Sequence, residues 1–189
     1  MKKKLLSILF ISLFLTLSSC GDKKGGRNDL SEKEKTENGD SKGLVIILEG
    51  VFPTNDMYQL FYSNSNTFSE DKSVRVPIYG QTVMQSVVIE LPEGVKPQNL
   101  RLDYGANVEQ TGISIKNVEF LYNDNKFNIS HEDFYGKYFR DGQGTSFNPI
   151  KLTIELRPNA DGNFDPYALS TDELKKSLNK IYNKSKEEK

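Results

Sequence analysis

The chain has 189 residues, of which 27% are charged and 36% hydrophobic, and this length suits one domain of ordinary size. Its 25 basic and 26 acidic residues leave a formal net charge of −1, which argues against a nucleic-acid partner. One cysteine and one histidine exclude an internal disulfide and any zinc site built from several such side chains.

Residues 1–20 have the pattern of a lipoprotein signal peptide. Three lysines at 2–4 precede an apolar stretch at 5–17, and residues 17–20 read Leu-Ser-Ser-Cys, as in a lipobox. The apolar stretch is well short of the roughly 20 residues that a transmembrane helix needs. We therefore expect residues 1–19 to be removed and the thiol of Cys20 to carry lipid, which holds the protein at a membrane.

Lipidation would define both the location and the charge of the mature protein. Removal of the three lysines leaves 22 basic against 26 acidic residues, a net charge of −4. Gly21, rather than aspartate, follows the cysteine, which favours the outer membrane of a Gram-negative bacterium. Residues 20–43 contain almost no hydrophobic side chain, Leu30 excepted, so they are predicted to be a disordered tether.

From Leu44 onward, apolar residues alternate with polar ones, which is typical of β-strands. The first strand, nearly continuous in apolar residues, is expected to be buried on both faces. Pro77 restricts its strand to a sheet edge or a strand end, and a change of phase near Asn117 predicts a β-bulge. Eight strands are predicted, at 44–51, 57–62, 74–78, 83–91, 99–104, 113–121, 126–129 and 150–156.

This pattern predicts a mainly β fold, an antiparallel jelly-roll-like β-sandwich over residues 44–169, with a barrel as the alternative. Residues 170–189 are predicted to be a C-terminal helix and tail. Ser170 and Glu173 have the spacing of a capping box. After it, one helix face is apolar and is formed by Leu174, Leu178, Ile181 and Tyr182. We expect this face to dock on the sandwich. Binding of a partner helix and fraying of the helix in solution are the alternatives.

Signatures of catalysis are scarce in the sequence. His131 lies in a polar segment and is expected to be solvated, and neither a G-x-S-x-G motif nor a glycine-rich phosphate loop is present. The prediction is a non-catalytic protein without a cofactor. A polysaccharide-active enzyme with a catalytic pair of carboxylates is the alternative, because sequence spacing does not define the separation of two carboxyl groups.

A calcium site is the one metal prediction. Oxygen-bearing side chains alternate at Asp161, Asn163 and Asp165, as in the first half of a calcium loop, but Pro166 stands where an EF-hand requires glycine. A turn built from Asx residues is the alternative, and we favour it.

A second set of residues suggests ligand binding. Tyr58 and Tyr62 share one face of their predicted strand, and Arg101 and Asp103 share one face of theirs. Tyrosine rings and polar side chains on one sheet face would suit a glycan. An ordinary solvated face is the alternative reading.

Three stretches resemble a known group of domains. They read Asp-Met-Tyr-Gln-Leu-Phe-Tyr at 56–62, Asn-Leu-Arg-Leu-Asp-Tyr-Gly-Ala-Asn at 99–107 and Gly-Ile-Ser-Ile-Lys-Asn-Val at 112–118. They are similar to β-sandwich modules attached to bacterial membrane glycosyltransferases and found in uncharacterised lipoproteins. The resemblance covers about residues 44–129 and departs at Tyr104, where those modules often have proline.

The resemblance implies a fold like that of a carbohydrate-binding module, without a defined ligand. It leaves open whether Gln59, Arg101 and Asp103 form a binding site or a polar network that stabilises the fold. The expected function is therefore a lipid-anchored, non-catalytic envelope protein that binds glycan. A protein-interaction subunit of an envelope complex is the second hypothesis, and a polysaccharide-active enzyme is the third.

Overall fold

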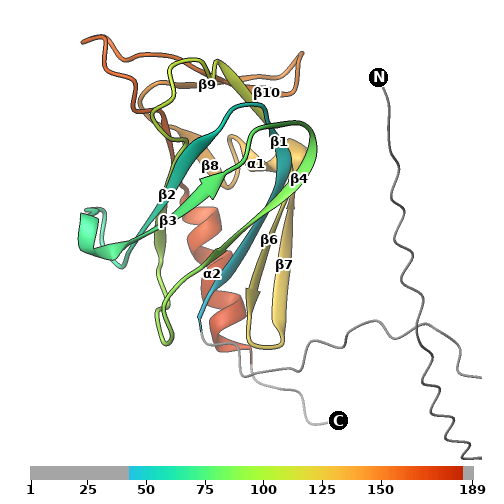
Figure 1. Cartoon of the computed structure of the whole chain (residues 1–189). Helices are drawn as coiled ribbons and strands as arrows, with labels where there is room; N and C mark the ends of the chain where they lie inside the picture. Colours follow the sequence, from blue (N-terminus) through green and yellow to red (C-terminus); the bar gives the residue numbers. More distant parts are fainter. Residues whose placement is uncertain (1–42, 185–189) are drawn as a thin grey trace, which may run out of the picture. The chain divides into compact units, whose positions relative to one another are not determined.

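Two antiparallel β-sheets pack face to face in residues 43–184, the part of the chain that this computed structural model describes (Figure 1). The predicted signal peptide, Cys20 and all but the last residue of the predicted tether lie outside this part. The chain crosses repeatedly between the sheets, as in a jelly roll. The predicted β-sandwich with a short C-terminal helix is confirmed.

The six-stranded sheet has the order β4-β1-β6-β10-β9, and β7 pairs with the second half of β6. Its strands are β1 (Val45–Phe52), β4 (Gln81–Glu90), β6 (Gly112–Tyr122), β7 (Asn125–Ser130), β9 (Thr145–Asn148) and β10 (Thr153–Leu156). The five-stranded sheet has the order β3-β2-β5-β11-β8. Its strands are β2 (Asp56–Ser63), β3 (Ser73–Ile78), β5 (Asn99–Asp103), β8 (Phe139–Asp141) and β11 (Tyr167–Ser170).

The core lies between the two sheets. Every second side chain of β1 points inward and is buried, because successive side chains of a strand alternate between its faces. Leu48 of β1, Leu60 of β2 and Leu102 of β5 are at most 2% exposed. The outward residues of β1 are half-buried, so the prediction that this strand is buried on both faces is wrong.

The predicted bulge in β6 is confirmed. Asn117 lies opposite Glu49 of β1 and Ile115 lies opposite Gly50, so Lys116 is an extra residue on β6. The extra residue restores the inward direction of the side chains after the phase change. Ile115 and Val118 are therefore both buried, although they are three positions apart.

The strand predicted at 150–156 is too long. Ile150 is 93% exposed, and Leu152 has a φ of 55°, a left-handed conformation that does not continue a strand. These residues form the turn between β9 and β10, and β10 begins at Thr153. By contrast, β3 with Pro77 lies at a sheet edge, as predicted.

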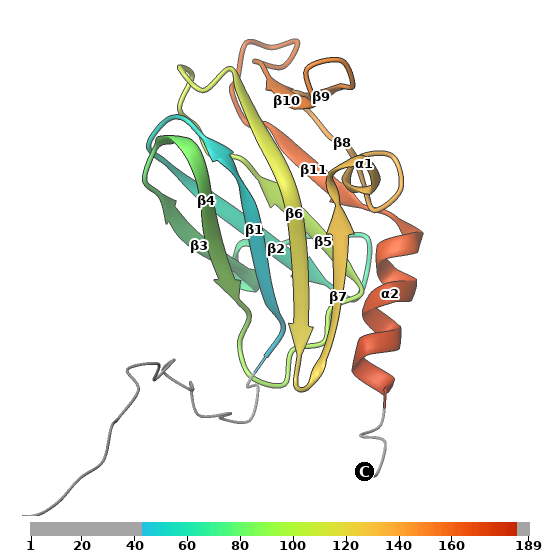
Figure 2. The same cartoon turned by 90° about the vertical axis from the view of Figure 1, so that its right-hand side faces the viewer.

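Three helical segments complete the fold: η1 (Glu70–Lys72), α1 (His131–Phe134) and α2 (Asp172–Asn183). Helix α2 lies beside β7 and packs its apolar face on the sandwich, as expected (Figure 2). Leu174, Leu178 and Ile181 are buried in the core, and the Tyr182 hydroxyl donates a hydrogen bond to the carbonyl oxygen of Pro97. No helix in residues 43–184 has the length and hydrophobicity that a membrane span requires.

The predicted capping box does not form. Thr171, not Ser170, is the N-cap residue, and its hydroxyl donates to the carbonyl oxygens of Lys137 and Tyr138 instead of capping the helix. Ser170 belongs to β11, and its hydroxyl accepts a hydrogen bond from the Leu100 amide. The hydroxyl groups of Ser170 and Thr171 therefore bond to other parts of the fold and not to the first turn of α2.

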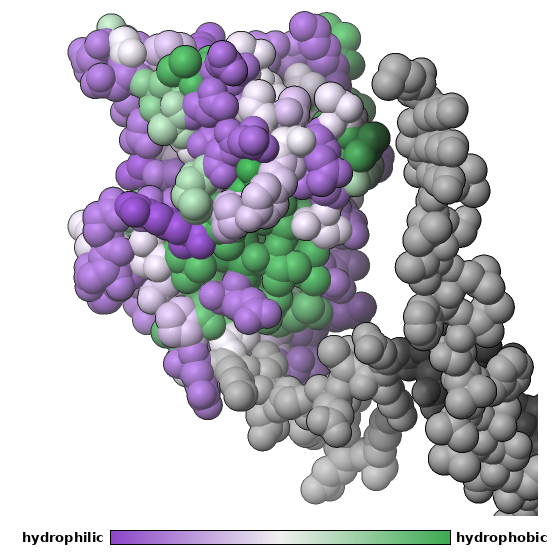
Figure 3. All heavy atoms as spheres, in the orientation of Figure 1, coloured by the Kyte–Doolittle hydropathy of each residue, from purple (hydrophilic) through white to green (hydrophobic). Residues whose placement is uncertain are grey.

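The two ends of the described chain lie at the same pole of the sandwich, with β6 and β7 between them (Figure 2). Val45, at the start of β1, is paired with Leu121 near the end of β6. Asn125, the first residue of β7, donates from its side-chain amide to the carbonyl oxygens of Ile181 and Lys184. The side of the molecule on which β3 and β4 lie has apolar surface at its middle (Figure 3).

Candidate functional site

The outer face of the five-stranded sheet carries a row of polar side chains across four strands. Tyr167 of β11 is paired with Asp103 of β5, Asp103 with Gln59 of β2, and Gln59 with Arg75 of β3. Cross-strand partners share a face of the sheet, so these four residues lie side by side.

A second row lies next to the first. Arg140 of β8 is paired with Leu169 of β11, Leu169 with Arg101 of β5, and Arg101 with Phe61 of β2. At a strand spacing of about 4.8 Å, the row from β8 to β2 spans roughly 14 Å. The two rows together form a surface large enough for more than one sugar ring.

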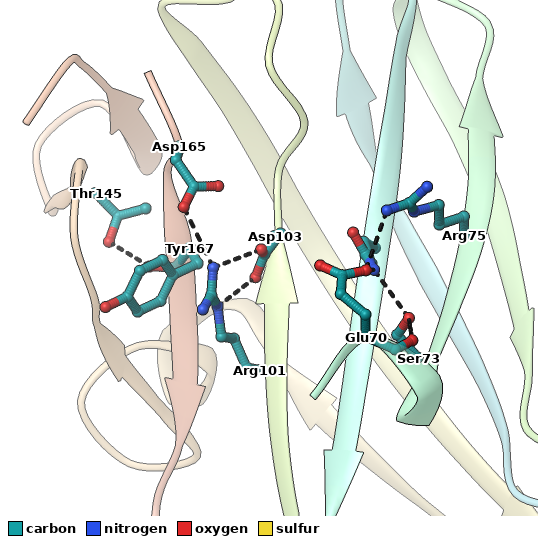
Figure 4. Close-up of polar contacts among 9 residues, drawn as sticks. Glu70, Ser73, Arg75, Arg101, Asp103, Thr145, Asp165 and Tyr167 are labelled. Carbon is teal, nitrogen blue, oxygen red and sulfur yellow. Dashed lines mark hydrogen bonds and ion pairs between the residues drawn. The ribbon is translucent and has the colours of Figure 1, made fainter. Parts of the chain in front are cut away.

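Arg101 is the centre of this surface (Figure 4). Its Nε and Nη2 donate to the two carboxylate oxygens of Asp103 at 2.8 and 2.7 Å, and Nη2 also lies 3.4 Å from an oxygen of Asp165. The guanidinium carbon lies 3.9 Å from the centre of the Tyr167 ring and 5.1 Å from that of Phe61. Stacking and paired hydrogen bonds together hold the guanidinium in one orientation. We call Phe61, Arg101 and Tyr167 the Arg101 ridge.

The Asp103 carboxyl group is the most strongly perturbed titratable group on this face. Its side chain is 10% exposed, and burial raises the pKa of Asp103 to about 6, although the hydrogen bonds and charge of Arg101 oppose this shift. Asp103 is therefore mainly ionised at neutral pH and becomes protonated in mildly acidic solution.

Hydrogen bonds support both ends of the first row, from the buried Thr145 at one end and from the exposed Glu70 and half-buried Ser73 at the other. The Thr145 hydroxyl donates to the carbonyl oxygen of Tyr167 at 2.9 Å, which anchors the backbone that carries this ring. Gln59 donates through Nε2 to Glu70 and to the Ser73 hydroxyl, and Arg75 pairs with Glu70 at 3.1 Å (Figure 4). The amide carbonyl of Gln59 is left as an acceptor on the surface.

Two pockets flank the Arg101 ridge. The first, here called the Asp103 pocket, has a volume of about 270 Å³ and is lined by Asp56, Gln59, Arg75, Asp103 and Asp165, among others. The second, the Arg140 pocket, has a volume of about 450 Å³, and its lining includes Asn66, Phe68, Asn99, Arg140, Leu169 and Asp172.

The Asp56 carboxylate has a structural role in the Asp103 pocket. Its oxygens accept hydrogen bonds from the amides of Met57, Ala106 and Asn107, which joins the start of β2 to the loop after β5. Gly105 in this loop has a φ of 85°, and a Cβ atom there would lie 2.1 Å from the Asp56 carboxyl group. Glycine is thus required by both the backbone conformation and the close contact.

The four residues predicted to bind ligand do not share one face, and this part of the prediction is wrong. Arg101 and Asp103 lie on the outer face, whereas Tyr58 and Tyr62 belong to the inward side of β2. Tyr58 is completely buried between the rings of Phe52 and Tyr104, and Tyr62 is half-buried against the core.

The Tyr58 hydroxyl is part of a buried hydrogen-bond network. It accepts a hydrogen bond from Nε2 of Gln110, which also donates to the carbonyl oxygen of Tyr104. The Gln110 side-chain carbonyl accepts from the Thr54 hydroxyl. Burial raises the pKa of the Tyr58 hydroxyl far above its ordinary value. Tyr58 is thus a core residue that joins the two sheets.

The expectation that His131 is solvated is also wrong. His131 is buried, and Nδ1 lies within hydrogen-bond distance of the Ile115 carbonyl oxygen. Because a carbonyl can only accept, Nδ1 carries the proton. Nε2 has no hydrogen-bond partner and faces apolar neighbours that include Phe134 and Phe147. This surrounding gives the imidazole a packing role.

The residues predicted to bind calcium lie in an exposed turn. The Asn159 side-chain carbonyl accepts hydrogen bonds from the amides of Asp161 and Asn163. Asp165 is turned toward Arg101. Within residues 43–184, no three acidic, histidine or cysteine side chains gather in a way that suits a metal ion. Calcium binding stays a prediction.

The Arg101 ridge contains two aromatic residues that the sequence did not place in the site, the half-buried Tyr167 and Phe61, which is 5% exposed and supports Arg101. Tyr167 belongs to the four-residue strand β11, which is too short to show a periodic pattern. Arg140 and Asn99 of the second pocket were missed as well, since only the pairing of distant strands brings them together. Comparisons with protein families, curated proteins and solved structures find no match to this chain.

Proposed function

We propose that the outer face of the five-stranded sheet binds carbohydrate. The observation that carries this proposal is the Arg101 ridge, in which two aromatic rings hold a guanidinium between two surface pockets. Aromatic side chains pack against the C–H faces of sugars, while amide and carboxylate groups pair with sugar hydroxyls. On this face the half-buried ring of Tyr167 offers the aromatic contact and Gln59 offers an amide, whereas Phe61, 5% exposed, supports the guanidinium.

Binding, rather than hydrolysis, is the activity that we propose. Asp103 and Asp165 both contact the same Nη2 atom of Arg101, at 2.7 and 3.4 Å, so the two carboxyl groups lie close together. However, the guanidinium of Arg101 donates to both oxygens of Asp103, so this carboxyl group is engaged in an ion pair that does not include a substrate. The pair is better suited to orient Arg101 than to act as acid and base.

The test is a glycan array with the full-length protein in detergent. We expect saturable binding to at least one polysaccharide, weakened about tenfold or more by Gln59→Ala and by Tyr167→Ala. Matched controls are Gln81→Ala and Tyr79→Ala, which change exposed residues outside this face and should leave binding unchanged. Absence of glycan binding, with recovery of one stoichiometric protein from membranes, would favour a subunit of an envelope complex instead.

We propose, in addition, that Cys20 carries lipid and places the domain in the cell envelope. The support is the sequence of residues 1–20 alone. Metabolic labelling with an alkyne fatty acid should mark the wild-type protein and leave Cys20→Ala unmarked. Equal labelling of the two proteins would contradict the anchor.

A further inference from the structure

On the basis of the proposed function, we infer that the Arg140 pocket receives the carboxylate of an acidic sugar, so that the glycan is a uronic-acid-containing polysaccharide. The inference starts from the arginines of the outer face. Three arginines lie there, one each on β3, β5 and β8, and all three line or border a pocket.

Arg140 differs from the other two arginines in its charge balance. Arg75 pairs with Glu70, and Arg101 pairs with Asp103 and Asp165. Among the residues that the structure describes, Arg140 has no ion-pair partner, and its side chain is exposed. Its guanidinium is therefore free to bind a carboxylate through two parallel hydrogen bonds.

The two pockets differ in charge, and this difference assigns the carboxylate to one of them. The Asp103 pocket contains three carboxyl groups, from Asp56, Asp103 and Asp165, against one basic side chain, Arg75, so its excess of negative charge would repel an acidic group. The Arg140 pocket contains one acidic residue, Asp172, and one basic residue, Arg140 itself. An acidic sugar is thus favoured in the Arg140 pocket, and a neutral sugar with free hydroxyls in the Asp103 pocket.

The remaining lining of the Arg140 pocket suits the rest of a sugar ring. Its volume of about 450 Å³ lies in the usual range of ligand sites. Phe68 offers an aromatic surface, and Asn66 and Asn99 offer amides. Asn99 uses its NH₂ group to donate to the Ser65 carbonyl oxygen, which holds its side chain in place.

The position of the two pockets on one face indicates how a polymer would lie. The Asp103 pocket is built on β3, β2 and β5, and the Arg140 pocket on β5, β11 and β8. A chain that contacts both must cross the strands over the Arg101 ridge and present several units. The geometry therefore favours binding along a polymer over capture of a single free sugar.

The experiment compares acidic polymers with their uncharged counterparts. Full-length protein is titrated calorimetrically with polygalacturonate and alginate, and with the same polymers after reduction of their carboxyl groups. Each titration is repeated with Arg140→Gln, with Arg140→Lys, and with Arg157→Gln. The last variant removes the same charge from an exposed arginine that does not line the pocket.

We expect at least one acidic polymer to bind, and Arg140→Gln to weaken this binding about tenfold or more. Arg140→Lys should weaken it less, because it keeps the charge and loses the paired hydrogen bonds. Arg157→Gln should have little effect, and carboxyl reduction should abolish the difference between wild type and Arg140→Gln.

The other outcomes separate this inference from the proposed function. If reduced polymers or neutral glycans bind as well as acidic ones and Arg140→Gln has no effect, the inference fails and carbohydrate binding stands. If acidic polymers bind and Gln81→Ala weakens binding as much as Arg140→Gln, the assigned face is wrong. If no polymer and no array glycan binds, both proposals fail.

Discussion

The guanidinium of Arg101, on β5, lies 3.9 Å from the centre of the Tyr167 ring, on the neighbouring strand β11. Sequence positions 66 apart thus meet as cross-strand neighbours, and the ring covers the guanidinium while Asp103 binds its edge. This relationship joins the last strand of the sandwich to the middle strand of the five-stranded sheet.

Replacement of Arg101 should destabilise the fold more than replacement of Arg75. Arg101→Ala leaves the Asp103 carboxylate, 10% exposed, without its two donors, and we expect the free energy of unfolding to fall by about 1–3 kcal/mol. Arg75→Ala breaks an exposed ion pair and should cost less than about 1 kcal/mol. Urea denaturation measures both, and equal losses would contradict the role given to Arg101.

Asp103 should make the stability depend on pH between about 4 and 6. Its folded pKa is raised to about 6 from an ordinary value of 3.8, so the folded chain binds this proton more tightly than the unfolded chain. The resulting stabilisation is fully present below about pH 4 and is lost as the pH rises through 6. The free energy of unfolding of wild type relative to Asp103→Asn should fall by about 1–3 kcal/mol over this range. Urea denaturation at a series of pH values tests this, and a difference that stays constant would contradict it.

Tyr58 should affect stability and leave ligand binding unchanged. Tyr58→Phe keeps the ring and removes the hydroxyl that accepts from Gln110, so we expect a loss of about 0.5–1.5 kcal/mol. Tyr58→Ala creates a cavity at a completely buried site and should cost about 3–5 kcal/mol. Tyr79→Phe, at an exposed ring, is the matched control. Glycan binding altered by Tyr58→Phe at full stability would place Tyr58 in the site after all.

The docking of α2 should contribute strongly to stability. Leu178 is completely buried, and Leu178→Ala should lower the free energy of unfolding by about 2–5 kcal/mol. Lys180→Ala, on the exposed side of the same helix, should change it by less than about 0.5 kcal/mol. Thermal and urea unfolding compare the two variants, and a small effect of Leu178→Ala would mean that the helix detaches easily.

The turn at 159–165 should depend on Asn159 rather than on a metal. Asn159→Ala removes the acceptor for two backbone amides and should cost about 0.5–1.5 kcal/mol. We expect EDTA to leave Tm unchanged. A lower Tm in EDTA that calcium restores and magnesium does not would instead support the calcium site at Asp161, Asn163 and Asp165.

The alternation of apolar residues is strong enough to predict most of the sandwich. The bulge in β6 could be predicted because the phase of the pattern changes where Lys116 is inserted. The turn at Ile150 and Leu152 could not, since these apolar residues continue the alternation of β10 although they are exposed. The strands β8, β9 and β11 have three or four residues each, which is too short for an alternation of polar and apolar residues to be recognised.

The site could be predicted only in part, for a related reason. Alternation shows that Tyr58 shares a face with Leu60 and that Gln59 shares one with Phe61, but both sets contain large apolar groups. Which set faces inward depends on the neighbouring strands. Arg101 and Asp103 were identified because two leucines mark the opposite face of β5, whereas Asp165 and Tyr167 reach Arg101 only through the pairing of β5 with β11.

The position of Val45 and Lys184 at one pole determines where anything joined to the domain must lie. Anything joined to either end departs from the same pole, beside the turn between β6 and β7 (Figure 2). A fusion partner or affinity tag placed after Lys184 would thus crowd the pole at which β1 begins. The opposite pole, with the loops around Gly105 and Asn159, stays clear of both ends, so a polymer bound as proposed on the outer sheet face can extend along the domain without meeting them.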